Sequence, residues 1–377
     1  KLRDRDYDAD RAGYRYVRGD ATDQPGQALT VYNTNHDLTE QSAGFEVDYR
    51  LPWRSKLTFG YEYEEVDRRN SAVEETEEDI YTLAYRIQPW SNFTTRLQLQ
   101  YADRAADTYE WAQDYYALLD VELINATPDN RRYTNHPQLM QYYMANRERW
   151  EGKADFSYLP SDRWNLNLNT LWRYDDYDQS RLGLTESEWI RGQFSASYVA
   201  SETLSTTVYV GYDRYDGNQS SRAFRGGQEK NAFEVYPPLP QASDPQQNWD
   251  LDAEDHTVTL GASLLWQPAA DLELALDYSY VDTTAEQELQ TRPGSSSTAS
   301  DLPDVDTTLH HVEASGTWHL QDNLSLKLDY QYYSYESDDW AWDKLQANTI
   351  GKVLTFGQDK PDEDLHYVGA SVIYRWQ

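Results

Sequence analysis

The sequence predicts an all-β fold, a transmembrane antiparallel up-and-down β-barrel of about 14 strands. Three observations predict it. Runs of alternating apolar and polar residues recur along the chain, and alternate residues of a strand face opposite sides. Tight turns alternate with long polar loops, and aromatic residues gather at the ends of the runs, as they do in outer-membrane barrels.

The composition permits this interpretation. The chain has 377 residues, 39% of them hydrophobic, with a mean hydropathy of -0.89 and a net charge of -32. Those values also fit a soluble acidic or disordered chain, but 32 tyrosines and 13 tryptophans argue against disorder. Amphipathic strands lower the mean hydropathy because only every second residue faces lipid. No apolar run is long enough for a transmembrane helix.

The charge and the missing cysteines exclude several functions. Nucleic-acid binding needs basic patches for the phosphates, which this acidic chain lacks. The absence of cysteine excludes disulfides, thiolate metal sites and covalent haem attachment through CxxCH, so any haem must belong to a partner. Lys1 opens the sequence without a signal peptide, and because a barrel must be exported, we expect processing or further chain upstream.

The first strands share one pattern, in which apolar and polar residues alternate. Residues 1–10 fit the upper end of a strand, 11–38 a polar loop, and about 39–51 a strand with Arg50 on its polar side. The apolar positions of the next three strands, which alternate with polar ones, are Leu57, Phe59, Tyr61 and Tyr63; Tyr81, Leu83, Tyr85 and Ile87; and Phe93, Leu97, Leu99 and Tyr101. The longest loop, roughly 104–148, contains Pro137 in a position suited to the first turn of a short helix, LMQYYMANR.

The remaining strands form further hairpins. Strand 149–159 turns back through Trp164, Leu166, Leu168 and Trp172, whose alternate neighbours are polar and rule out a dry core. Three hairpins turn through ASET, PAAD and LQDN, separated by loops near 217–255, 284–306 and 337–363. The last strand, DLHYVGASVIYRWQ at 364–377, has an apolar face that includes Val368 and Val372. Because lipid cannot satisfy backbone hydrogen bonds, this strand must find a partner strand.

These runs give 13 strands from residue 39 onward and one at the N-terminus. Tyrosines lie next to the long loops (Tyr278, Tyr280, Tyr330, Tyr332), and Trp266, Trp318, Tyr374 and Trp376 lie next to short turns. Two interfacial girdles follow. A soluble β-sandwich or β-solenoid also shows alternation, but a dry core tolerates few Asn, Arg, Asp and Gln on the second face.

The hairpins resemble the MtrB/PioB outer-membrane proteins that accompany decahaem cytochromes. The resembling stretches are YEYEEVDR at 61–68, TEEDIYTLAYR at 76–86, YADR at 101–104, NRERWEGKADFSYLPSDRWNLNL at 146–168, YDDYDQSRLGL at 174–184, SYVASETLSTTVYVGYDRYDG at 197–217 and the closing HYVGASVIYR. Each is weak alone, but together they span nearly the whole chain. The family's barrels have about twice this strand count, which implies that residues 1–377 form one domain, the C-terminal half of a larger barrel.

The resemblance implies a sheath that surrounds and insulates a periplasmic multihaem c-type cytochrome, so that electrons reach an extracellular multihaem cytochrome or acceptor. The barrel would contact outer-membrane lipid and lipopolysaccharide. Its lumen-facing partner-contact candidates are Arg50, Glu62, Arg86, Arg96, Gln98, Lys153, Asp155, Asn165, Asn167, Asn169, Arg173, Asp277, Lys327, Asp329 and Arg375. A general or substrate-specific diffusion porin is the alternative, since a polar lumen suffices for it. A barrel enzyme lacks recognisable catalytic residues.

Metal sites are weakly indicated. His310, His311 and His319 share one strand, which favours a solvated lumen or rim role over metal binding. The acidic loop runs Asp301 to Asp306 and Asp359 to Asp364 have oxygen ligands that suit Ca²⁺, but they lack an ordered calcium-loop spacing.

The sequence also predicts how the barrel is oriented in the membrane and how wide it is. The turn pattern predicts a periplasmic C-terminus and extracellular long loops. About 14 tilted strands close at a backbone diameter of roughly 30 Å, whereas about 26 give roughly 55 Å. Only the wider ring accommodates a folded multihaem cytochrome, so the sheath function requires more strands than this sequence contains.

Overall fold

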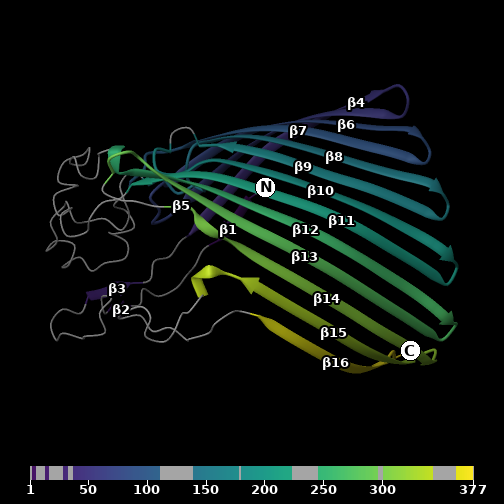
Figure 1. Cartoon of the computed structure of the whole chain (residues 1–377). Helices are drawn as coiled ribbons and strands as arrows, with labels where there is room; N and C mark the ends of the chain where they lie inside the picture. Colours follow the sequence, from purple (N-terminus) through teal and green to yellow (C-terminus); the bar gives the residue numbers. More distant parts are fainter. Residues whose placement is uncertain are drawn as a thin grey trace.

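A computed structural model describes residues 2–5, 13–16, 29–32, 37–110, 139–177, 180–222, 245–295, 300–342 and 362–376. Its main element is a single sheet of 14 antiparallel strands in the order β1, then β4 to β16 (Figure 1). Each strand from β4 onward pairs with the next strand of the chain, which is up-and-down topology. The strands β2 (Gly13–Tyr16) and β3 (Leu29–Tyr32) form a separate hairpin.

The predicted 13 strands from residue 39 onward are confirmed, and a short N-terminal strand joins them. The sheet strands are β1 (Leu2–Arg5), β4 (Leu38–Leu51), β5 (Ser55–Arg68), β6 (Glu75–Trp90), β7 (Phe93–Ala106), β8 (Arg147–Ser161), β9 (Trp164–Asp176), β10 (Gly183–Ser201), β11 (Leu204–Arg222), β12 (Asn248–Ala269), β13 (Leu272–Thr291), β14 (Leu302–Gln321), β15 (Leu324–Asp338) and β16 (Glu363–Tyr374).

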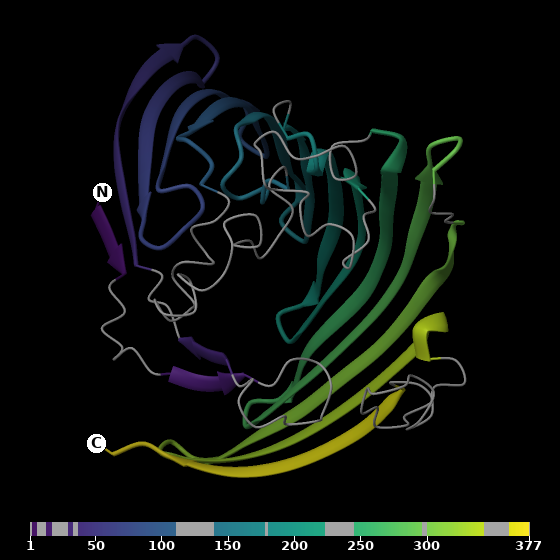
Figure 2. The ribbon, with the colours of Figure 1, turned by 90° about the vertical axis from the view of Figure 1, so that its left-hand side faces the viewer.

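The sheet curves strongly, so that it has a concave and a convex face (Figure 2). The tight turns lie at one end of the strands and the long connections at the other, called here the turn end and the loop end (Figure 1). In the described residues the edge strand β16 pairs only with β15 and the other edge strand, β1, pairs only with β4, so the curved sheet is open.

Large apolar side chains cover the convex face. Leu83, Leu99, Val208, Leu260 and Leu328 are each 45% to 55% exposed there. In a soluble sandwich a second sheet would bury such residues, but the buried hydrophobic residues of the described chain are few and cluster at the loop end. The convex face is therefore suited to lipid, and the fold is that of an outer-membrane barrel wall.

Aromatic residues form two rows on the convex face, as predicted, but the loop-side row lies within the strands rather than at their ends, as Tyr280 does in β13 (Leu272–Thr291). In the loop-side row their polar atoms bond to groups on the same or a neighbouring strand. These pairs are Tyr61 Oη to Asp79 (2.6 Å), Trp172 Nε1 to Glu188 (2.7 Å), Tyr280 Oη to Asp282 (3.0 Å) and Tyr332 Oη to Asp364 (3.2 Å). Each ring thus has an apolar body on lipid and a polar tip toward water, the arrangement of an interfacial girdle.

Some predicted boundaries were wrong. The short helix expected over LMQYYMANR is absent from its described part, Leu139 to Asn146, where Tyr142 to Met144 form a turn. The 11–38 region contains the β2–β3 hairpin. Strands also extend into the predicted loops, since β11 continues to Arg222, β12 begins at Asn248 and β13 continues to Thr291. In these extensions the convex face is polar, and in β12 the apolar residues Trp249, Leu251 and Ala253 lie on the concave face instead, so the pattern expected for a lipid-facing strand does not mark them.

Among the described residues, no helix has the length and apolar character required to cross a membrane.

Candidate functional site

The concave face is the candidate site. Cross-strand pairing fixes it, because directly paired residues share a face: Arg96 pairs with Asp155, Asp155 with Asn169, and Asn169 with Gln193. By this rule the concave face carries Arg50, Glu62, Arg86, Arg96, Gln98, Lys153, Asp155, Asn165, Asn167, Asn169, Arg173, Asp277, Lys327 and Asp329. Arg375 follows the end of β16, where its amide donates to the Asn323 carbonyl. Contact of any of them with a partner stays a prediction.

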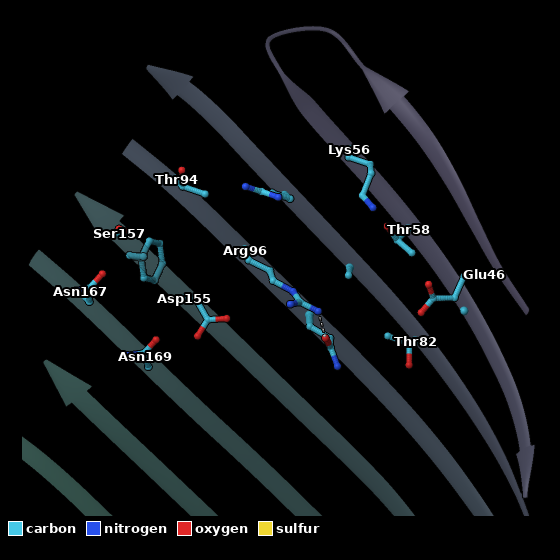
Figure 3. A pocket seen from close by; sticks show the side chains of 15 residues that line it. Glu46, Lys56, Thr58, Thr82, Thr94, Arg96, Asp155, Ser157, Asn167 and Asn169 are labelled. Carbon is cyan, nitrogen blue, oxygen red and sulfur yellow. Dashed lines mark hydrogen bonds between the residues drawn. The ribbon is translucent and has the colours of Figure 1, made fainter. Parts of the chain in front are cut away.

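A hollow of about 570 Å³ lies on this face between β4 and β9 (Figure 3). Its charged lining residues are Glu46, Lys56, Arg86, Arg96 and Asp155. Its neutral polar lining residues are Thr58, Thr82, Thr94, Gln98, Ser157, Asn167 and Asn169. The hollow brings together six of the predicted candidates from four strands, and its donors and acceptors can bind water or a polar protein surface.

Ion pairs are concentrated nearer the loop end of the same strands. Arg149 holds Asp175 with two parallel bonds of 2.6 and 2.8 Å. Arg173 donates to Glu151 at 2.6 and 2.9 Å, and Arg147 bonds to Glu78. Asp175 and Glu151 are buried, so this network is rigid and closely paired. Lys153 joins the network through Glu151 at 2.5 Å, and only Lys153 and Arg173 of its members were sequence candidates, because the pairing depends on a register that the sequence does not show.

Loop segments pack over the concave face at this end. We call this unit the cap, and it consists of Ala72, Val73, Tyr109, Met140 and Met144. Arg104 holds the turn by donating to the carbonyl oxygens of Tyr142 (2.6 Å) and Ala145 (2.9 Å). These two carbonyls are therefore satisfied by a side chain, which accounts for a turn where a helix was expected.

Gly183 brings β10 close to the cap. Gly183 has φ of 105°, and a Cβ there would lie 2.5 Å from the carbonyl oxygen of Met140, so only glycine permits this approach. Tyr177 follows β9, and burial raises its pKa, with Asp175 adding to the shift.

Trp189 is a concave-face residue that the sequence analysis missed. The guanidinium carbons of Arg191 and Arg173 lie 4.5 and 5.3 Å from the centroid of its ring, and its Nε1 donates to Asp213 at 2.6 Å. Its spacing of two residues from Arg191 was the available signal, since it places both on one face.

The histidines and acidic groups considered for metal binding form hydrogen bonds within the protein. His310 Nδ1 bonds to Tyr278 Oη at 3.0 Å, and the same pairing joins His256 to Tyr212 and His366 to Tyr330. Asp301 and Asp306 accept bonds from Leu289 N and Thr284. Residues 359–361 lie outside the described residues, while Asp364 accepts from Tyr332. The described carboxylates that converge most closely are instead Glu65, Glu75 and Glu77.

Comparison with known proteins gives one family. The family model described as "Putative outer membrane beta-barrel porin, MtrB/PioB" matches residues 1–376. "Outer membrane protein MtrB" of Shewanella baltica (strain OS185) is 23% identical over 350 residues, which cover 92% of this chain and 44% of that protein. The chain thus spans less than half the length of this curated relative.

Solved outer-membrane barrels are also similar, at low identity. The ferric-catecholate import receptor Fiu from E. coli K12 is 10% identical with a TM-score of 0.47, over 81% of this chain and 54% of the receptor. The ferric citrate transporter FecA is 11% identical with a TM-score of 0.46, over 90% and 53% of the two chains.

Proposed function

Because the chain belongs to the MtrB/PioB family of putative outer membrane beta-barrel porins, we propose that it forms the wall of a sheath around a multihaem c-type cytochrome. The cytochrome enters from the periplasm. The sheath keeps lipid away from its haem chain and lets electrons pass to an extracellular multihaem cytochrome or acceptor. The haem belongs to the partner, since this sequence has no cysteine for covalent attachment.

The observation that supports this proposal most directly is the contrast between the two faces of one sheet. The convex face is apolar and girdled by aromatic residues, whereas the concave face carries paired charges, amides and hydroxyls. Such a face resembles the polar part of a protein interface, and it is held rigid by cross-strand bonds. A single layer of strands can therefore separate a charged protein from lipid.

The width of the wall bears on the proposal. A ring of about 14 strands has a backbone diameter of roughly 30 Å, too narrow for a folded multihaem protein once side chains are added. The sheet is open, and its edge strands have backbone groups that further strands can pair. The sheath therefore includes strands beyond those of this sheet.

Haem content tests the function. The complete protein is purified from outer membranes of its native host with an affinity tag on a long loop, and the haem absorbance per barrel is measured together with the intact mass of each component. Retention of a multihaem protein at a fixed ratio is the expected result. A haem-free barrel with a mature mass near 44.0 kDa would contradict the sheath and leave a porin.

Orientation is tested separately. We expect the turn end and the C-terminus in the periplasm and the loops around 104–148, 217–255, 284–306 and 337–363 outside the cell. Protease added to intact cells should cut within 290–300 and spare the PAAD turn at 268–271. The reverse pattern would invert the topology.

A diffusion porin is the second candidate. The hollow on the concave face supports it, because a wet polar lumen is sufficient for solute passage. Stepwise single-channel conductance from the haem-free complete protein would favour the porin, whereas a purified complex that blocks conductance would favour the sheath.

A further inference from the structure

Four cations lie side by side across four strands of the concave face, near the turn end. Arg50 of β4 pairs directly with Lys56 of β5, Lys56 with Arg86 of β6, and Arg86 with Arg96 of β7. We call this set the cation row. Like charges directly opposite each other in neighbouring strands destabilise a sheet. A row of them in a chain of net charge -32 therefore calls for a compensating anion.

The described carboxylates compensate this row only in part: Glu46 and Asp155 line the hollow beside it, and Asp48 attracts Arg50 as well as Lys56. Lys56 is the one member with an ion pair in the described part of the chain, to Asp48 at 3.0 Å. Arg96 donates to the neutral Gln98 at 3.2 Å although Asp155 lies opposite it. Arg50 and Arg86 form no ion pair with any described residue, and both are exposed on the concave face. This contrasts with the network of Arg149 and Arg173, whose carboxylates are already occupied.

The surroundings of the cation row suit carboxylates. Lys56, Arg86 and Arg96 line the hollow, and hydroxyl and amide donors surround them, with Thr58, Thr94 and Asn167 visible in Figure 3. A guanidinium presents two parallel N–H donors that match the two oxygens of a carboxylate. The hollow is broad and open to the concave face, so it can take the side chains of a protein surface.

The opposite wall has the reverse charge. In strands β11 to β16, as far as they are described, the concave face carries Asp213, Asp277, Glu313 and Asp329, and its one basic residue other than histidine is Lys327. Lys327 is already paired with Asp329 at 2.6 Å. A carboxylate-bearing surface is therefore attracted to one side of the lumen and repelled by the other.

From this asymmetry we propose that the cation row is the docking site for a carboxylate-rich face of the protein held inside the barrel. The inference rests on the proposed sheath function and adds the chemistry of the partner's surface. Charge complementarity of this kind sets orientation and association rate. The row therefore fixes how the partner is rotated about the barrel axis and which strands face its acidic side.

Neutral variants test the row. In the complete protein, Arg86→Gln together with Arg96→Gln removes two charges and keeps hydrogen-bonding side chains. We expect the variant barrel to fold as well as wild type, by heat-modifiable migration on gels, because opposed charges are removed. Its affinity for the haem partner should fall about tenfold or more, with a weaker dependence on salt. The matched control, Arg214→Gln, removes an arginine charge from the convex face of β11 and should leave affinity unchanged.

Zero-length crosslinking with a carbodiimide tests the chemistry, because it joins a lysine only to a carboxylate in contact with it. In the purified complex of an Arg86→Lys variant we expect mass spectrometry to find Lys56 and the introduced lysine joined to Asp or Glu side chains, or haem propionates, of the partner. Crosslinks only from Lys153 or Lys327 would overturn the proposal, as would unchanged affinity of the double variant. If the wild-type barrel retains no haem protein, the proposed function fails instead.

Discussion

The strands β4 to β9 and the strands β10 to β14 form two differently built halves of one wall. The first set has 13 to 16 residues per strand, and the second has 19 to 22. At about 3.3 Å per residue and a tilt near 40°, the second set is taller by roughly 15 Å. We call them the short half and the tall half.

The two halves satisfy their backbone differently at the loop end. In the short half, side chains such as Arg104 bond to loop carbonyls, and the cap packs over the concave face. In the tall half, the strand ladder itself continues, with Arg222 still paired to Asn248. The backbone groups above the membrane can therefore be satisfied in two ways within one sheet: side chains bond to the loop carbonyls, or the strands continue and pair with each other.

The largest expected loss of stability comes from breaking a buried ion pair in the short half, compared with an exposed ion pair in the tall half. Arg149→Met leaves the buried Asp175 without its bidentate partner and should reduce the free energy of unfolding by about 3 to 5 kcal/mol. Arg191→Met in the tall half breaks a more exposed pair with Asp213 and should cost about 1 kcal/mol or less. Urea unfolding in lipid vesicles, followed by tryptophan fluorescence, measures both. Equal losses would contradict the distinction between the halves.

Arginine on the convex face should have the same effect in both halves. Leu97→Arg in β7 and Leu260→Arg in β12 place a charge in lipid and should each cost about 2 to 4 kcal/mol near the bilayer midplane. The control variants Gln98→Arg and Thr259→Arg face the lumen and should cost far less. Vesicle unfolding gives all four values, and a lumen variant that costs as much as its neighbour would reverse the assignment of faces.

Loss of the cap's central side chain should affect the short half alone. Met144 is 2% exposed, and Met144→Ala should cost about 2 kcal/mol through the cavity that it leaves. Limited proteolysis should then cut near residues 139–146 faster, while cleavage around 292–295 in the tall half stays unchanged. Equal acceleration at both places would show that the cap is not a local unit.

The smallest effect lies at the junction of the halves. Trp189→Leu removes the ring between Arg173 and Arg191 and should cost about 1 kcal/mol, the value expected for exposed cation–π contacts. A double-mutant cycle with Arg191→Gln isolates the coupling between the two side chains. Coupling below the error of the measurement would mean that the stacking does not stabilise the junction.

The sequence predicted the wall well wherever hydropathy alternates. Leu83, Leu99 and Leu328 lie on the convex face as expected, and the count of strands is confirmed. The prediction failed in the extensions of the tall half, because residues such as Asp216 and Asp252 make the convex side polar above the aromatic girdle. An apolar convex side marks the membrane-crossing part of a strand, whereas in the extension of β12 the apolar residues Trp249, Leu251 and Ala253 lie on the concave side.

The sequence predicted on which face of the sheet each site residue lies, but not which residue it pairs with on the neighbouring strand. Alternation placed Arg86, Arg96 and Lys153 on the polar side, yet whether a cation meets a carboxylate or another cation depends on register between strands. The cap could not be predicted from the sequence for a similar reason, because it depends on contacts such as the bond from Ser71 to Met144, which are 73 residues apart in the chain. Such long-range contacts leave no periodic signal in one sequence.

The girdle on the loop side also sets the height at which the wall is immersed. Tyr61, Trp172, Tyr280 and Tyr332 each bond to a polar group, and these anchors are spread from β5 to β15. Vertical displacement of the barrel by more than about one residue, roughly 3 Å, would draw several of these polar tips into hydrocarbon at once. The girdle thus fixes the vertical position of the whole wall in the membrane. A protein bound to the concave face is then held at a defined depth relative to the bilayer. The distances from its two ends to the aqueous compartments are therefore set without any contact between that protein and lipid.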